Sequence, residues 1–329
     1  MDFYGTIGPA CCTQEVLEKM YTNGMTGIRL NLSHGMLGDH EHWLDTARKA
    51  AENVGKKTKI LVDLQGPELR IGSYDGEIRL NEGENICFGS EGIPLPDILY
   101  SQCEKGMHLL LDDGKMEVVL SECKEGYIDA KVLRGGNLKP RKSIAVIGKA
   151  IQTPTLTEKD LENLKVAKQY GVTGVMLPFV RSVEDLMCLK ETLKAFDAED
   201  IAIFAKIENM QGVHSIENFM ALADEIVIAR GDLGNAMPLW ELPRIQKQIS
   251  KICKDAGKPF MVVTQMLDSM EHRQVPTRAE VSDIYNAVLD GASSVMLTGE
   301  TAVGEYPDLA MMYLVNTAKA ATEDRSNEY

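Results

Sequence analysis

The sequence lacks the cysteine pattern, the long apolar run and the leader that would mark a secreted or membrane-spanning protein. Its seven cysteines form no C-x-x-C pair, and an odd number without disulfide or zinc spacing favours a reducing compartment. No window approaches the ~18 to 20 consecutive apolar residues needed to cross a bilayer. The opening residues, MDFYGTIGPA, lack the basic start and apolar stretch of a signal peptide. We therefore expect a cytoplasmic protein with no membrane partner.

Positive charge is also scarce. The chain has 35 lysines and arginines against 49 aspartates and glutamates, which gives a formal net charge of −14. Such a balance argues against the basic face of a nucleic-acid-binding protein and against an anionic membrane surface. It does not exclude a phosphorylated substrate, because a few local cations and a metal can reverse the sign inside a cleft.

Short apolar runs alternate with amphipathic segments along most of the chain. The runs are nearly continuous, as in parallel strands covered on both faces, and the amphipathic segments carry helix signals such as an N-cap at Thr13 or Thr157. Eight strand–helix units close most simply into a (β/α)₈ TIM barrel of α/β class. An open doubly wound sheet is the alternative, but no Gly-x-Gly-x-x-Gly follows the first strand. The predicted strands are Tyr4–Ile7, Gly27–Leu32, Ile60–Leu64, Gly174–Phe179, Ile201–Ile207, Glu225–Ala229, Phe260–Thr264 and Ser294–Leu297.

The alternation breaks once, after the third predicted strand. Residues 73–149 read as β-hairpins with little helix, one over 76–89 and others turning at Asp113-Gly114 and Glu125-Gly126. We expect this segment to form a small β-barrel lid domain inserted into the catalytic barrel of residues 1–72 and 150–329. A mobile lid over the carboxyl ends of the barrel strands is the expected role.

Polar and charged residues gather where the predicted strands end. Lys206 and Glu208 stand two apart at one strand end and should project from the same face. Glu208 and Asp232 follow neighbouring strands, and two carboxylates with open positions suit Mg²⁺ or Mn²⁺. Lys206 beside such a metal suits a transferring phosphoryl group or a developing enolate. The backbone N–H groups of Gly231–Gly234 are available to an anion. The alternative is a structural ion-pair network that also includes Arg230.

The motifs at these positions resemble those of pyruvate kinases. The similarity extends from about residue 5 to residue 316 and covers both the barrel and its insertion. The shared motifs occur in the family's order: TIGPA, IRLNLSHG, LVDLQGPELRIG, LLLDDGK, TLTEKD, PFVRS, AKIEN, ARGDLG, TQMLDSM, PTRAEVSD and LTGETAVGEYP.

The resemblance implies transfer of the phosphoryl group of phosphoenolpyruvate to ADP, giving pyruvate and ATP in glycolysis. It implies Glu208 and Asp232 as Mg²⁺ (or Mn²⁺) ligands, and Lys206 as the catalytic cation at the phosphoryl group and enolate oxygen. Arg29 matches a phosphate-binding residue, and Thr264 matches a residue involved in enolate protonation. Gly231, with these residues, matches the substrate-binding positions.

The resemblance also implies a potassium site and a nucleotide site. Glu68 stands where potassium-dependent members carry glutamate and independent members carry lysine, so K⁺ dependence is expected. The residues matching the potassium ligands are Asn31, Ser33, Asp63 and Leu64, the last through its carbonyl. The residues matching the nucleotide-binding positions are His34, Arg70 and Lys142.

Several positions depart from the family pattern. The chain ends at Tyr329 without the usual C-terminal domain, so we expect no sugar-phosphate activation of the usual kind, while a homodimer through the barrel is still compatible. Pro178 replaces the serine usual before Phe179, which removes a hydroxyl and a backbone N–H. Two alternatives stay open: a metal-dependent lyase or phosphatase acting on phosphoenolpyruvate or related oxo-acids, and a non-catalytic regulatory relative. ADP-dependent turnover separates the first alternative from a kinase.

Overall fold

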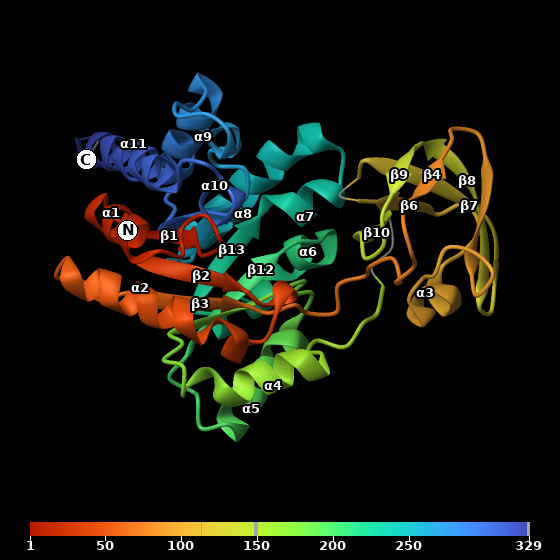
Figure 1. The fold of residues 1–329 in the computed structure, drawn as a ribbon, viewed down its shortest axis with the longest axis horizontal. Coiled ribbons are helices and arrows are strands. Elements are labelled where there is room, and N and C mark those ends of the chain that lie inside the picture. The colour runs from red at the N-terminus through yellow and green to blue at the C-terminus, as the bar shows by residue number, and fades with distance from the viewer. Residues whose placement is uncertain (113, 148–150, 328–329) are drawn as a thin grey trace. The chain divides into compact units, whose positions relative to one another are not determined.

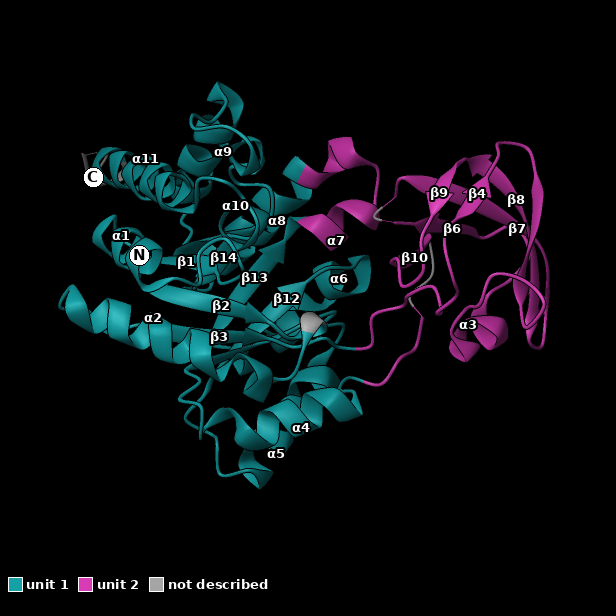
Figure 2. Cartoon of the chain, viewed as in Figure 1, with its two compact units in different colours: residues 1–66, 155–230, 243–329 teal, residues 67–154, 231–242 magenta. Residues whose placement is uncertain are grey.

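The computed structural model describes residues 1–112, 114–147 and 151–327. The chain divides into two compact units, shown in teal and magenta in Figure 2. Unit 1 comprises residues 1–66, 155–230 and 243–329, and unit 2 comprises residues 67–154 and 231–242. The domain borders expected at 72/73 and 149/150 stay predictions.

Unit 1 contains a closed barrel of eight parallel strands among the described residues, which confirms the predicted (β/α)₈ fold (Figure 1). Neighbouring strands are in regular register, so that Asn31 lies opposite Asp63 and Ala229 opposite Val263. The barrel strands, in spatial order, are β1 (Asp2–Thr6), β15 (Ser294–Leu297), β14 (Phe260–Val263), β13 (Glu225–Ala229), β12 (Ala202–Ile207), β11 (Gly174–Leu177), β3 (Lys59–Asp63) and β2 (Gly27–Asn31).

The barrel interior is filled by side chains rather than open. Tyr4 and Phe204 meet edge to face with ring centroids 6.5 Å apart, and methionines from three strands complete the cluster. Because continuous apolar strands need cover on both faces, amphipathic helices surround the barrel. These helices are α1 (Gln14–Thr22), α2 (Glu41–Asn53), α4 (Glu158–Ala167), α5 (Val183–Ala195), α6 (Met210–Phe219), α8 (Leu242–Asp255), α9 (Arg278–Leu289), α10 (Gly299–Ala302) and α11 (Pro307–Asn327).

The two predicted N-caps differ in the structure. Thr157 caps α4 with its side chain, which accepts a hydrogen bond from the backbone N–H of Asp160, and Asp160 bonds back to the cap. Thr13 occupies the N-cap of α1 but makes no such side-chain bond. Short 3₁₀ turns connect several elements: η1 (Leu32–His34), η2 (Leu37–His40), η3 (Met220–Leu222), η4 (Leu239–Glu241) and η5 (Asp268–Glu271).

Unit 2 is built mainly of antiparallel strands. Its described residues form a five-stranded sheet in the order β10-β6-β7-β8-β5 and a separate two-stranded sheet, β4-β9, rather than one closed ring. The predicted turn at Glu125-Gly126 is confirmed as the β7–β8 hairpin, whereas Asp113 lies outside the described residues. The elements are β4 (Ile78–Leu80), β5 (Asn85–Gly89), α3 (Asp97–Gln102), β6 (His108–Leu111), β7 (Met116–Lys124), β8 (Tyr127–Arg134), β9 (Gly136–Leu138) and β10 (Ile144–Ile147), together with most of α7 (Arg230–Asn235).

The predicted hairpin over residues 76–89 is wrong. β4 pairs with β9, and β5 pairs with β8, so the two segments do not pair with each other. The backbone of Gly83 and Glu84 hydrogen-bonds to Val132 at 2.8 and 2.9 Å, which attaches the turn itself to β8. This attachment directs β5 along β8 and leaves β4 for another partner. No described helix in either unit is long and apolar enough to span a bilayer.

Candidate active site

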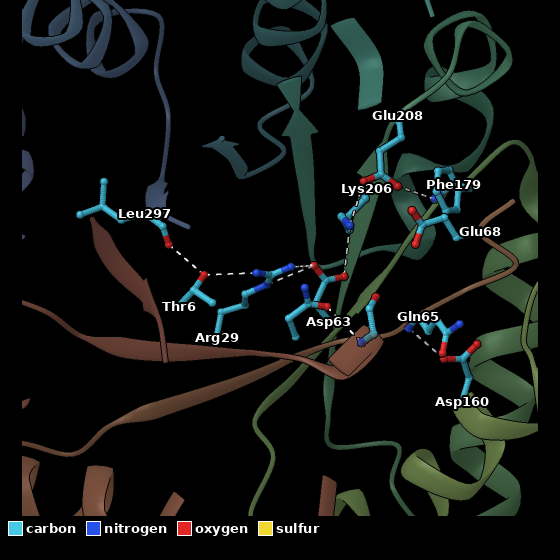
Figure 3. A network of polar contacts seen from close by, with 12 residues as sticks. Thr6, Arg29, Asp63, Gln65, Glu68, Asp160, Phe179, Lys206, Glu208 and Leu297 are labelled. Carbon is cyan, nitrogen blue, oxygen red and sulfur yellow. Dashed lines mark hydrogen bonds and ion pairs between the residues drawn. The ribbon is translucent and has the colours of Figure 1, made fainter. Parts of the chain in front are cut away.

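A chain of buried ion pairs lies at the carboxyl ends of β2, β3 and β12 (Figure 3). Lys206 Nζ lies 2.8 Å from Glu208 Oε1 and 3.1 Å from Asp63 Oδ1. Arg29 donates to Asp63 Oδ2 from Nε at 3.1 Å and from Nη2 at 2.5 Å. The expected pairing of Lys206 with Glu208 is therefore observed. Asp63 extends this pair into a chain of four charges.

The charges in this chain balance, since Arg29 and Lys206 face Asp63 and Glu208. All four side chains are at most 13% exposed, so water screens them weakly. Burial by itself would raise the pKa of the Asp63 carboxyl, but the charges of Lys206 and Arg29 outweigh it and hold that pKa below its ordinary value. Asp63 is thus an anion that fixes two cations.

Arg29 is anchored on its other side by the first barrel strand. Its Nη1 lies 3.3 Å from Thr6 Oγ1, and the Thr6 hydroxyl donates to the carbonyl of Leu297 at 2.9 Å. These bonds link β1, β2 and β15 at one level of the barrel. A planar guanidinium held along two edges has little freedom, as positioning of a phosphate requires.

The second oxygen of Glu208 is bound by backbone. The N–H of Phe179 donates to Glu208 Oε2 at 2.8 Å, and Phe179 has a φ of 54°, an uncommon value for a bulky residue. Pro178 packs against Gly66, where an added Cβ would lie 2.4 Å from the proline Cγ and where φ is +60°. Pro178, which departs from the family pattern, has no N–H of its own. The N–H of the next residue, Phe179, is present and binds Glu208.

Thr264 follows β14 in a strained turn. Thr264 has a φ of 80° and Gln265 a φ of 53°, although neither is glycine. Each such residue costs on the order of 1 kcal/mol or more unless the surroundings enforce it. Arg230 donates to the Thr264 carbonyl at 2.7 Å, and its Nη1 pairs with Asp283.

The predicted potassium ligands lie at the ends of β2 and β3. Asn31 and Asp63 are register partners, and Asn31 Oδ1 accepts the backbone N–H of Ser33 at 3.1 Å. Leu64 donates its own N–H to the carbonyl of Met176 at 3.2 Å, and its carbonyl is the predicted ligand. An amide, a hydroxyl, a carboxylate and a carbonyl form an all-oxygen donor set, which fits a hard cation.

Of the two predicted magnesium ligands, Glu208 belongs to unit 1 and Asp232 to unit 2, so their joint site stays a prediction. Gly231 and Asp232 lie in the first turn of α7. No three His, Cys, Asp or Glu side chains among the described residues could hold a metal. Carboxylate oxygens from Glu208 and Asp232 fit Mg²⁺, which usually takes only one or two protein carboxylates and keeps water or substrate oxygens.

The predicted nucleotide residues of unit 2 are held by acidic neighbours. Arg70 Nη2 lies 2.7 Å from Glu68 Oε2, and Lys142 Nζ lies 2.8 Å from Asp112 Oδ1. Burial acts to raise the pKa of Asp112, but hydrogen bonds from lysines, Lys142 first, hold it below its ordinary value. The side chain of His34 lies outside what the structure describes.

One acidic residue next to this site was not predicted. Asp160 is fully buried and accepts from the backbone N–H groups of Gln65 and Gly66 at 3.0 and 3.4 Å (Figure 3). It also accepts from Thr157 N and Oγ1 at 2.9 and 2.7 Å. One carboxylate therefore holds both segments through which the chain leaves and re-enters unit 1. The Thr-x-x-Asp spacing of TEKD indicates the cap, but nothing in it indicates the bonds to Gln65 and Gly66.

Buried, paired charges at the carboxyl ends of the strands of a (β/α)₈ barrel are typical of TIM-barrel enzymes, whose active sites lie at that face. Comparison with known proteins identifies the family. The family described as "Pyruvate kinase, barrel domain" matches residues 2–311. The pyruvate kinase of Staphylococcus saprophyticus is 37% identical, over 96% of this chain and 56% of the relative. That of Geobacillus stearothermophilus is 40% identical, over 92% and 53%, and that of Sporosarcina psychrophila is 37% identical, over 98% and 57%.

The chain belongs to the pyruvate kinase family. This confirms the resemblance inferred from the motifs. The chain spans about half the length of the curated relatives it matches.

Proposed function

We propose that this chain carries out the pyruvate kinase reaction, in which phosphoenolpyruvate and ADP give pyruvate and ATP. The observation that supports this most is the buried chain Arg29–Asp63–Lys206–Glu208. Phosphoryl transfer depends on positioning and charge neutralisation more than on covalent chemistry. A fixed ammonium and a fixed guanidinium in a site shielded from water supply both.

Each residue of the chain has a distinct part in this proposal. Lys206 neutralises the transferring phosphoryl group and then the enolate oxygen, and Arg29 orients the phosphate. Asp63 keeps both cations in place, because its two carboxylate oxygens each bind one of them. Thr264 takes part in delivering the proton to the enolate carbon.

The cations in this proposal are Mg²⁺ (or Mn²⁺) on Glu208 and Asp232, and K⁺ on the oxygens of Asn31, Ser33, Asp63 and Leu64. When bound, they would neutralise charge that develops on the phosphoryl and enolate oxygens. Gly231 and Asp232 offer backbone N–H groups to the substrate carboxylate. His34, Arg70 and Lys142 bind the nucleotide.

The deciding experiment measures pyruvate and ATP together. The protein is incubated with phosphoenolpyruvate, Mg²⁺ and K⁺, with and without ADP. We expect equal amounts of pyruvate and ATP, and none of either without ADP. Pyruvate formed without ATP would show a phosphatase or lyase instead. If the folded protein forms no pyruvate, the result would favour the non-catalytic relative.

The same assay tests the potassium site. We expect replacement of K⁺ by Na⁺ to lower the rate roughly tenfold, the effect of losing about 1.4 kcal/mol of transition-state stabilisation. An unchanged rate in Na⁺ would contradict the assignment of Glu68 to the potassium-dependent type.

A cytoplasmic location is part of the proposal. The seven cysteines, all among the described residues, are thiols rather than disulfides, as a reducing compartment favours. Dimerisation through the barrel stays a prediction, which sedimentation of the purified chain would test.

A further inference from the structure

A single guanidinium holds the strained turn that carries Thr264. Because Ala229 and Val263 are register partners, Arg230 and Thr264 leave adjacent strands at the same level. Arg230 donates to the Thr264 carbonyl from Nε at 3.1 Å and from Nη2 at 2.7 Å. Nη2 also lies 3.2 Å from the carbonyl of Gln265. Three of its contacts thus fall on two consecutive peptide groups.

Those two residues are the ones that need support. Thr264 and Gln265 both have positive φ, at 80° and 53°, and a β-branched residue rarely adopts such a value. Strained conformations persist where the surrounding structure enforces them, and they concentrate at functional sites. The fork of Arg230 is rigid and always charged, so it can fix both carbonyl groups at once.

Arg230 is itself oriented from a third element. Its Nη1 lies 2.6 Å from Asp283 Oδ2, on α9, and the arginine side chain is only 11% exposed. All three elements, the start of α7, the end of β14 and helix α9, contribute to one interaction. The contact therefore ties the position of the turn to the outer helix layer.

We infer that Arg230, oriented by Asp283, is a positioning residue for the reaction, because it fixes the strained turn that presents Thr264. This inference rests on the proposed function, in which Thr264 takes part in protonating the enolate. Loosening the turn should then slow proton delivery more than substrate binding. A purely structural Arg230 would instead alter unfolding and leave the proton step unchanged.

The test compares Arg230→Lys and Asp283→Asn with the wild type. Lysine keeps the charge but cannot reach both carbonyls in a fixed plane. We expect Arg230→Lys to lower kcat by about tenfold to a hundredfold, as small misplacements of reacting groups do, with little change in the KM for phosphoenolpyruvate. Asp283→Asn should show the same pattern more weakly. Exchange of the C3 protons of pyruvate with deuterated water, followed by NMR, should fall in parallel.

A rescue variant separates positioning from charge. Gln265→Gly removes one residue's strain, because glycine adopts positive φ freely. In the Arg230→Lys background it should restore part of the lost kcat and exchange rate. Absence of rescue, or a slowed kcat with unchanged exchange, would overturn the inference.

Two further outcomes distinguish this inference from the proposed function. If the wild type is active, and kcat of both Arg230→Lys and Asp283→Asn lies within about twofold of it, the inference alone is overturned. A wild type that forms no pyruvate would overturn the proposed function and the inference with it.

Discussion

The two ends of the barrel bury polar groups in opposite ways. At the amino end, Glu225 opens β13 and accepts hydrogen bonds from the hydroxyls of Ser293 and Ser294 at 2.7 and 2.6 Å. Burial raises the pKa of Glu225 above its ordinary value, and these serine bonds only partly offset the increase. At this end, the hydrogen bonds that partly compensate the burial of the carboxyl come from the neutral hydroxyls of neighbouring serines.

At the carboxyl end, charged groups are buried together and the backbone is strained. Arg29, Asp63, Lys206 and Glu208 form one chain of ion pairs. Three of the six non-glycine residues with positive φ among the described residues also follow barrel strands there: Phe179, Thr264 and Gln265. A fold needs neither feature, since a buried ion pair contributes little net stability and strain opposes folding. The comparison therefore supports the proposal that the active site lies at the carboxyl end of the barrel.

The strongest test of this comparison removes the central cation. Lys206→Ala should lower the rate of ATP formation by about 10²- to 10³-fold, the loss typical when a charge-stabilising donor is removed. The change is measured by steady-state kinetics, with circular dichroism to show that the barrel still folds. Wild-type turnover by a folded Lys206→Ala protein would contradict the role given to this residue.

Asp160 offers a smaller test, at the border of unit 1. Asp160→Asn keeps the shape but weakens hydrogen bonds to a charged acceptor, so the free energy of unfolding should fall by about 1 to 3 kcal/mol. Activity should also fall several-fold, because Gly66, which Asp160 holds, packs on the segment that binds Glu208. Urea unfolding and kinetics measure the two effects.

Thr157→Ala is the matched control for Asp160. It removes the cap hydroxyl of the same helix and should cost about 1 kcal/mol of stability. It leaves in place the hydrogen bonds that the backbone N–H groups of Gln65 and Gly66 donate to Asp160, so activity should stay unchanged. Equal losses of activity in both variants would show that the helix cap, and not the hold on Gln65 and Gly66, matters.

The smallest expected effect concerns acid stability. Burial acts to raise the pKa of Asp185, but hydrogen bonds from Arg181 and Thr155 outweigh it and hold that pKa below its ordinary value. A depressed carboxyl pKa stabilises the fold above the unfolded-state pKa of about 3.9 and loses that contribution as pH falls through the folded-state value. Asp185→Asn should therefore destabilise the protein at pH 7 and flatten its loss of stability below about pH 4.

Urea unfolding between pH 3 and pH 7 measures this difference. The control is Glu191→Gln, an exposed carboxyl on the same helix, which should leave the acid limb unchanged. An acid limb as steep in Asp185→Asn as in the wild type would assign the effect to other carboxyls.

The barrel could be predicted because its signals are local. Continuous apolar strands followed by amphipathic helices recur eight times, and each strand is short enough to be found from its own residues. The strand pairing in unit 2 could not be predicted, because the hydrogen bond between Gly83 and Val132 joins segments that are far apart in the sequence. Turn residues alone suggested a hairpin over 76–89 that does not form.

The site shows the same limit. The spacing of Lys206 and Glu208 predicted their contact, since alternate residues of a strand share a face. Asp63 joins them from a different strand, and Arg230 contacts Thr264 and Asp283. These contacts depend on the register of the folded barrel, which the sequence spacing does not give. Backbone strain at Phe179, Thr264 and Gln265 has no signal in residue type at all.

The most direct measurement compares one carboxylate from each end of the barrel. Glu208→Gln and Glu225→Gln make the same chemical change, and ATP formation from phosphoenolpyruvate and ADP is followed for both. We predict that Glu208→Gln loses about 10³-fold in kcat/KM while Glu225→Gln stays within about twofold of the wild type. Equal activity in the two variants would contradict the claim that the chemistry takes place at the carboxyl end of the barrel.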